Sequence, residues 1–312
     1  MTDLRIVFLG TPNFARGILE SLILNQYNVV GVISQPDKPV GRKHEIKPTP
    51  VKKLALENNI PVYQPVKLKE ESDVVINLQP DLIITCAYGQ IVPDDILQTP
   101  KYGCLNIHPS LLPKYRGGAP IQRAIWNGDT ETGVCLMEMV KKMDAGRVFA
   151  RVTHPIDKDI TSSELFDELE RVSRKLLIDN LPLYLEGKLT GVEQDEDKVV
   201  IARNIAKEEE QVHFNQENIH EVYNHIRALI DTPIAYGMIE GKRMKFYEAR
   251  MEEKENAYPS GTILSFEDGA MIVACTGGLL KVYELQLEGK SKMKAKDFAN
   301  GAGRQLVGKR FE

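Results

Sequence analysis

Residues 5–10 of this chain form a short apolar run, Arg-Ile-Val-Phe-Leu-Gly, that ends at a glycine. Such a run is typical of a strand buried on both faces of a parallel sheet. A helical pattern follows it, because Pro12 suits a first helical position and apolar residues recur at helical spacing up to Leu22. Thr11 is placed to cap that helix. The sequence therefore predicts a strand, a turn and a helix, the unit of a doubly wound α/β fold.

Further short, β-branched runs alternate with turns and helix-like patterns in the first part of the chain. They cover residues 29–33, 82–86, 103–107 and 133–139. An amphipathic stretch from Thr161 to Leu185 carries one apolar stripe and closes this region. We expect residues 1–190 to form one domain around a mostly parallel, Rossmann-like sheet.

The second part of the chain has a different pattern. Residues 187–198 are acidic and show no apolar periodicity, so we place a linker at 191–205. A helical stretch at 216–229 then precedes short alternating runs bounded by Gly, Pro or charged turns. These runs cover 234–240, 243–250, 261–264, 270–275 and 279–285. They predict a second, smaller OB-like β-barrel domain over residues 206–312.

Length and composition exclude several classes of protein. With 312 residues, 42% of them hydrophobic, the chain can bury a core, and two domains are favoured. No apolar stretch is long enough to span a membrane, and residues 1–5 lack the start of a signal peptide, so we expect a cytosolic protein. The 4 cysteines and 6 histidines show no zinc-site spacing, which predicts neither disulfides nor a structural metal.

Polar side chains gather where the predicted strand 103–107 ends. Alternation along the strand places Cys104, Asn106 and His108 on one side. Binding sites of open α/β sheets lie beyond the carboxyl ends of the strands. The following loop, 110–120, is punctuated by Pro and Gly and is too elaborate for a simple connector. Asp144 lies in a turn that the sheet could bring to the same strand ends.

Alternative interpretations of these residues are weaker. The turn 10–15 has one glycine and a proline, unlike the GxGxxG of a nicotinamide site. Ser110 lacks the flanking glycines of a serine hydrolase, and Cys104 lies inside a strand, where burial opposes a thiolate. Taken singly, His108 and Asp144 are more often structural. Their combination with the loop favours a functional site.

The motif Asn106-x-His108-x-Ser110-Leu111-Leu112-Pro113, followed by Gly117 and Asp144, resembles the signature of the folate-dependent formyltransferases. The resemblance extends through nearly all of residues 1–190 and, more weakly, through the second domain. Four segments resemble the branch of the family that acts on methionyl-tRNA: 8–15, 35–42, 47–52 and 119–126. Residues 43–46, Lys-His-Glu-Ile, are less basic than that branch leads us to expect.

The resemblance implies an enzyme of translation initiation that moves a formyl group from 10-formyltetrahydrofolate to the α-amino group of methionyl-initiator tRNA. It implies that Asn106 stabilises the oxyanion, that His108 donates a hydrogen bond or transfers a proton, and that Asp144 orients His108 or holds a water. No metal is required, because attachment to the folate nitrogen already activates the formyl group.

Three other functions stay open at this stage. The nearest is a formyltransferase that acts on a sugar-nucleotide amine. The others are an RNA-binding module with an inactive α/β domain and a nicotinamide-dependent dehydrogenase.

The resemblance also implies where the substrates bind. Folate is expected along Ser110, Leu111, Leu112 and Pro113 and along Ala87, Tyr88 and Gly89. The net charge of −4 provides no global basic field, so tRNA would need local basic patches. Such patches lie at 35–53 and 290–296, and the expected tRNA contacts are Lys38, Arg42, Lys43, Lys47, Lys292 and Lys294. We expect a monomer that makes no contact with a membrane.

Overall fold

The computed structural model describes residues 3–40 and 45–312 and divides the chain into two compact units. The first unit comprises Met1–Gly117, Thr132–His154 and Phe166–Ile201. The second comprises Gly118–Glu131, Pro155–Leu165 and Ala202–Glu312. The last change of unit, between Ile201 and Ala202, falls within the expected linker. Two segments from the first part of the chain also belong to the second unit.

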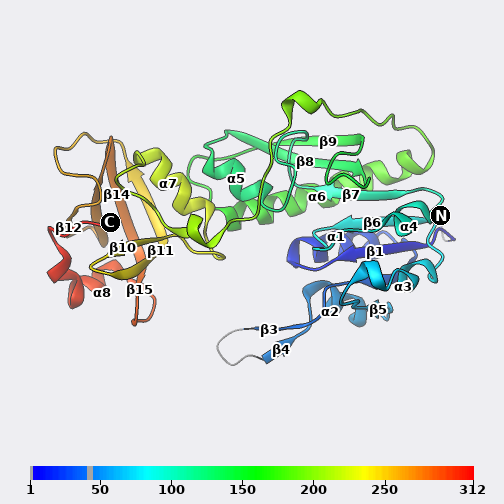
Figure 1. Ribbon diagram of the computed structural model, residues 1–312, viewed down its shortest axis with the longest axis horizontal. Helices are drawn as coiled ribbons and strands as arrows, with labels where there is room; N and C mark the ends of the chain where they lie inside the picture. Colours follow the sequence, from blue (N-terminus) through cyan, green and yellow to red (C-terminus); the bar gives the residue numbers. More distant parts are fainter. Residues whose placement is uncertain (1–2, 41–44) are drawn as a thin grey trace. The chain divides into compact units, whose positions relative to one another are not determined.

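The first unit is built on a seven-stranded sheet in the order β5-β2-β1-β6-β7-β8-β9 (Figure 1). Its parallel strands are β1 (Ile6–Gly10), β2 (Val29–Ile33), β5 (Val62–Tyr63), β6 (Leu82–Cys86) and β7 (Cys104–His108). β8 (Glu131–Glu138) pairs antiparallel with β7, and β9 (Val148–Pro155) forms the far edge. This confirms the mostly parallel α/β sheet.

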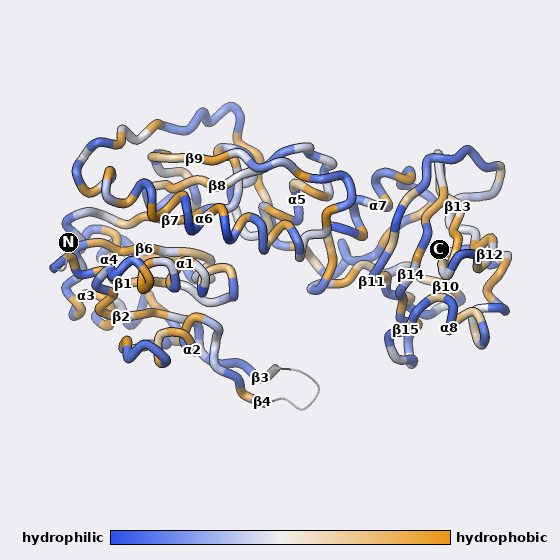
Figure 2. Tube along the Cα trace, turned by 180° about the vertical axis from the view of Figure 1, so that it is seen from behind, coloured by the Kyte–Doolittle hydropathy of each residue, from blue (hydrophilic) through white to orange (hydrophobic). Residues whose placement is uncertain are grey.

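The core of this unit follows from the apolar strands. Every residue of β1 and β6 is buried, and apolar residues gather on these strands in Figure 2. The order of the sheet reverses between β1 and β6, because β1 leads to β2 on one side and β6 leads to β7 on the other. Ligands of open α/β sheets bind at such a switch point.

Among the described residues, five α-helices lie wholly or mostly in this unit. They are α1 (Asn13–Leu24), α2 (Pro50–Glu57), α3 (Asp73–Ile76), α4 (Asp94–Gln98) and α6 (Ser162–Leu185). A short hairpin of β3 (Lys38–Val40) and β4 (Glu45–Lys47) projects from the unit just before α2 (Figure 1). The side chain of Thr49 caps α2 by accepting from the backbone N–H of Lys52.

The expected cap of α1 was wrong. Pro12 occupies the N-cap position, and it makes no side-chain hydrogen bond there. The Thr11 hydroxyl instead donates to the Tyr88 carbonyl oxygen at 2.9 Å and accepts from the Gln35 backbone N–H at 3.3 Å. Thr11 therefore joins the ends of β1, β2 and β6 rather than starting the helix.

The second unit contains an antiparallel sheet in the order β10-β11-β14-β13-β12, with β15 paired to β14. Its strands are β10 (Tyr236–Ile239), β11 (Lys242–Glu252), β12 (Ile263–Glu267), β13 (Ala270–Cys275), β14 (Gly278–Leu287) and β15 (Met293–Lys294). Its helices are α5 (Pro120–Trp126), α7 (Ile219–Ala228) and α8 (Ala295–Ala299). The predicted second β-domain is thus confirmed, and its sheet is antiparallel.

An aromatic cluster lies in the core of the second unit. The Phe214 and Phe311 rings stack with centroids 4.9 Å apart, and Phe246 meets both edge-on. Trp126 of α5 packs against the same core. No helix in the described part of the chain is long and apolar enough to cross a membrane.

Candidate active site

Asn106 and His108 lie at the carboxyl end of β7, and the neighbouring strand orients the first of them. Thr85 of β6 is in register with Asn106, and its hydroxyl donates to Asn106 Oδ1 at 2.9 Å. Because this bond engages the carboxamide oxygen, the amide Nδ2 is left to act as a donor. The sheet therefore presents a half-buried hydrogen-bond donor at the strand end.

His108 is buried, and its two ring nitrogens face different groups. Nε2 lies 2.9 Å from the carbonyl oxygen of Tyr115, which can only accept, so the neutral ring carries its proton on Nε2. Nδ1 faces the Asp144 carboxylate with 3.7 Å to Oδ2, longer than an ordinary hydrogen bond. The basic nitrogen of the neutral ring is therefore Nδ1, on the side of Asp144.

Asp144 lies in a turn between β8 and β9 that hydrogen bonds hold at two points. The backbone N–H of Gly117 donates to Asp144 Oδ2 at 2.9 Å. The Gln194 side chain donates to the Asp144 carbonyl oxygen at 2.8 Å. Asp144 has a φ of 49°, which residues other than glycine rarely adopt. The structure thus brings Asn106, His108 and Asp144 together from the end of one strand and from one turn.

The loop after β7, where folate is expected, is fixed by hydrogen bonds and by apolar packing. Ser110 Oγ donates to the Lys114 carbonyl oxygen at 2.7 Å. Leu112 is buried with Cys135, Met137 and Val148. Leu111 packs beside Gly133, and the carbonyl oxygen of Pro113 accepts from Val200 N at 3.3 Å. The side chains of Ser110 and Leu112 thus shape the loop from within.

The other segment expected to bind folate follows β6. Ala87 and Gly89 are exposed and have positive φ angles of 45° and 95°. Tyr88 between them is buried, and burial raises the pKa of its hydroxyl to about 12. The small residues therefore leave exposed backbone at the strand end, while Tyr88 anchors the turn in the core.

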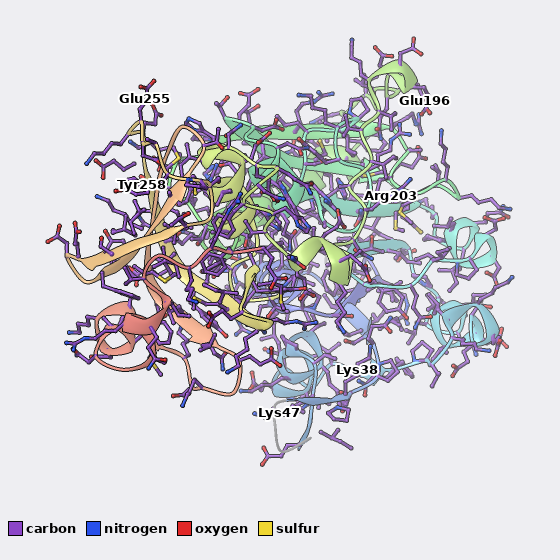
Figure 3. All side chains as sticks on the ribbon, turned by 60° about the vertical axis from the view of Figure 1, so that its left-hand side comes forward. Lys38, Lys47, Glu196, Arg203, Glu255 and Tyr258 are labelled. Atoms are coloured by element: carbon purple, nitrogen blue, oxygen red, sulfur yellow. The ribbon has the colours of Figure 1, made fainter. Side chains whose placement is uncertain are left out.

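The expected tRNA contacts divide into two groups. Lys38 and Lys47 are exposed and lie opposite each other in the register of the β3–β4 hairpin. Figure 3 labels both. Arg42 and Lys43 lie outside the described residues.

Lys292 and Lys294 belong to the second group, and both form ion pairs. Lys292 Nζ lies 2.7 Å from Glu284, and Lys294 Nζ lies 2.9 Å from Glu248. These lysines lower the pKa of the Glu284 carboxyl. The basic patch at 290–296 is therefore partly balanced by acids from β11 and β14.

The structure also bears on the alternative nucleophile and on metal binding. All four cysteines are free and buried, and burial raises the pKa of the Cys104 thiol to about 12, which opposes its use as a nucleophile. Within residues 3–40 and 45–312, no three His, Cys, Asp or Glu side chains are grouped so as to hold a metal ion.

Sequence reasoning missed Thr85, Tyr115 and Gln194, which orient the three candidate residues. Thr85 comes from the neighbouring strand, and Tyr115 orients His108 through its backbone carbonyl. Gln194 lies in a segment that looked like a linker. Its one signal is that it is a neutral amide among acids, at Gly-Val-Glu-Gln-Asp-Glu-Asp.

Comparison with known families gives two matches in this chain. The formyl transferase family matches residues 4–181, and the formyl transferase C-terminal domain matches residues 204–303. A methionyl-tRNA formyltransferase of Lactobacillus gasseri is 45% identical over 300 residues, which cover 96% of this chain and 95% of the relative. The methionyl-tRNA formyltransferase of Listeria innocua is 45% identical, with 97% of both chains covered.

Solved structures share the fold at lower sequence identity. WlaRD, a sugar 3N-formyl transferase solved with dTDP and 5-N-formyl-THF, has a TM-score of 0.67 and 21% identity, covering 92% of this chain and 99% of its own. HypX from Aquifex aeolicus, solved with tetrahydrofolic acid, has a TM-score of 0.69 and 20% identity over 97% of this chain. This chain spans 48% of HypX. These likenesses concern the fold alone.

Proposed function

This chain belongs to the methionyl-tRNA formyltransferases, and on that premise we propose that Asn106, His108 and Asp144 catalyse transfer of the formyl group from 10-formyltetrahydrofolate to the α-amino group of methionyl-initiator tRNA. The observation that carries the proposal is that an amide donor, a basic ring nitrogen and a carboxylate converge at the end of β7. The reaction forms a carbon–nitrogen bond to the amine and breaks the bond to N10 of the folate.

Asn106 is proposed to stabilise the tetrahedral intermediate. When the neutral amine attacks the formyl carbon, the carbonyl oxygen becomes an oxyanion that needs a donor already in place. Thr85 engages Asn106 Oδ1, so Nδ2 is the atom that donates to the oxyanion. No reorientation of the amide is needed during the reaction.

His108 and Asp144 are proposed to transfer a proton from the attacking amine to the leaving N10. The attacking amine loses a proton, and the leaving N10 must gain one. His108 Nδ1 accepts the proton while Nε2–H stays bonded to the Tyr115 carbonyl. The Asp144 carboxylate stabilises the resulting imidazolium, and Nδ1 then returns the proton to N10. These steps use protein groups and the activated donor, so we propose that no metal takes part.

The substrate contacts are part of the proposal. Folate lies along the Ser110–Pro113 loop and the Ala87–Gly89 turn. The tRNA contacts the hairpin of Lys38 and Lys47, whose side chains are exposed. Lys292 and Lys294 also bind the tRNA, and their ammonium groups then contact phosphates in place of Glu284 and Glu248. Residues 1–190 carry the chemistry, 191–205 link the domains, and 206–312 bind tRNA in a monomeric enzyme.

The test is formyl transfer to methionyl-initiator tRNA by the wild type and by Asn106→Ala and His108→Asn. Loss of one oxyanion donor costs about 10²–10³ in rate, so Asn106→Ala is expected to fall well below a tenth of wild-type turnover. His154→Asn is the matched control, because His154 Nε2 pairs with Glu168 at 2.7 Å, away from these residues. Its turnover should stay near that of the wild type.

Two outcomes would contradict the proposal. Near-normal turnover by folded Asn106→Ala would remove its role at the oxyanion. Formylation of a sugar-nucleotide amine but not of methionyl-tRNA by the wild type would keep the chemistry and change the acceptor.

A further inference from the structure

The Gln194 side chain makes three hydrogen bonds around the Asp144 turn. Its Nε2 donates to the carbonyl oxygens of Asp144 at 2.8 Å and of Gly146 at 2.7 Å. Its Oε1 accepts from Nε of Arg116 at 3.0 Å. Both amide hydrogens of Gln194 therefore form hydrogen bonds to the turn that contains Asp144.

Arg116 connects this amide to the loop that contacts the other candidate residues. Its side chain is 3% exposed, and Nη2 donates to Glu196 Oε1 at 2.8 Å. Its neighbours are Tyr115, whose carbonyl oxygen lies against His108 Nε2, and Gly117, whose N–H donates to the Asp144 carboxylate. The backbone N–H of Arg116 donates to the Val200 carbonyl oxygen at 2.9 Å.

Two backbone positions in this arrangement need outside support. Tyr115 and Asp144 have positive φ angles of 63° and 49°. For residues other than glycine, such conformations persist only where the surrounding structure imposes them. The Gln194 and Arg116 contacts join the loop to the Asp144 turn. They act beside the hydrogen bond from Gly117 N–H to the Asp144 carboxylate and the ion pair of Lys142 with Glu196, which also binds Arg116.

We propose that Gln194 and Arg116 are positioning residues for formyl transfer, which hold the Asp144 turn against residues 115–117 so that the Asp144 carboxylate keeps facing His108 Nδ1. The inference rests on the proposed roles of His108 and Asp144. Neither new residue touches a reacting atom. The segment 191–205 then has a second task besides joining the two domains, because it completes the support of the active site.

The first test compares full-length Gln194→Ala and Gln194→Glu with the wild type. Small misplacements of a catalytic group cost up to about 10²-fold, so we expect kcat to fall about 10-fold or more in both variants. The glutamate variant keeps the acceptor for Arg116 but loses both donors to the turn. KM for each substrate should change by less than about 3-fold, because neither substrate contacts Gln194.

Glu193→Gln is the matched control, since Glu193 is the exposed neighbour of Gln194, and its kcat should equal that of the wild type. Unchanged kcat in the Gln194 variants would overturn the proposal. Loss of folding in both variants would also overturn it, because Gln194 would then serve stability.

A double-mutant cycle separates positioning from a general structural role. If Gln194 acts through Asp144, adding Gln194→Ala to Asp144→Asn should lower kcat no further than Asp144→Asn alone. Multiplicative losses would overturn the proposal. Failure of the proposed function looks different, because the wild type would then not formylate methionyl-tRNA, or Asp144→Asn alone would leave kcat unchanged.

Discussion

At the scale of single residues, the site depends on which atoms are already engaged. Asn106 Nδ2 is available to donate to an oxyanion because the Thr85 hydroxyl bonds Asn106 Oδ1. His108 Nδ1 is available because Nε2 bonds the Tyr115 carbonyl oxygen. The residue types alone do not decide either orientation. A hydroxyl on the next strand and a backbone carbonyl in the loop decide them.

Arg123 and Glu209 show the same dependence on partners in the second unit. Two guanidinium nitrogens of Arg123 lie 2.8 Å from the two Glu209 carboxylate oxygens. This hydrogen bonding with Arg123 lowers the pKa of Glu209 to about 2, below the 4.5 of an unperturbed Glu. A carboxyl with a lowered pKa in the folded state stabilises that state above its unfolded pKa.

We therefore predict that the Glu209 contribution is complete above about pH 4.5 and is lost as the pH falls toward about 2. Thermal unfolding of the wild type and Glu209→Gln across this range checks it. The wild type should be more stable near neutral pH, and the two curves should converge in acid. Glu208→Gln is the control, because Glu208 is exposed. A pH-independent difference between wild type and Glu209→Gln would refute the prediction.

At the scale of elements, β8 and β9 position the loop that follows β7. Gly133 of β8 lies where Leu111 packs and where β9 passes closely. A Cβ at this position would lie 2.1 Å from the Val152 carbonyl oxygen and 2.5 Å from Leu111 Cδ2. The neighbouring backbone therefore requires glycine here, and the Leu111 contact extends the requirement to the loop.

Gly133→Ala is predicted to lower the free energy of unfolding by about 1–3 kcal/mol, because the added methyl group must push backbone or Leu111 aside. Displacing the loop should also reduce formyl transfer. Urea denaturation and the formylation assay on the same preparation measure both effects. Unchanged stability would show that the close contact relaxes at no cost.

At the scale of the whole molecule, each unit is assembled from separate stretches of the chain. In the second unit, the Trp126 and His225 rings stack with centroids 3.9 Å apart, although Trp126 lies in the part of the sequence matched by the formyl transferase family. The charges are also distributed unevenly. Lys38 and Lys47 are exposed on the hairpin, whereas Lys292 and Lys294 are paired with acids.

This distribution predicts how tRNA binding responds to salt. Each phosphate contact contributes about −0.9 to the slope of log K against log salt for duplexes. Lys38→Ala and Lys47→Ala should each reduce the slope by up to about 1, as expected for loss of one phosphate contact. Lys292→Ala should change it less, because Lys292 already has Glu284 as a partner. A flat salt response in the wild type would count against both groups of lysines.

Local pattern was sufficient for the long buried strands and for the candidate residues, but the short strands β3, β4, β5 and β15 lie outside every predicted run. The apolar runs at 5–10, 29–33 and 82–86 became buried strands, because burial on both faces demands continuous apolar residues. Alternation along a strand brought Asn106 and His108 to one strand end, and both are visible as neighbours in the sequence. The sequence by itself thus determined the parallel sheet, the second β-domain and the family signature.

Only the tertiary structure decided how those residues are held. Gln194 lies 50 positions from Asp144, and Thr85 lies 21 positions from Asn106, so no local period reports their contacts. The same holds for Thr11, whose hydroxyl donates to the Tyr88 carbonyl oxygen instead of capping the helix. It also holds for Lys292 and Lys294, which form ion pairs with glutamates of β14 and β11. Periodicity encodes which face of an element is buried, whereas hydrogen-bond partners depend on which distant segments the completed fold places beside it.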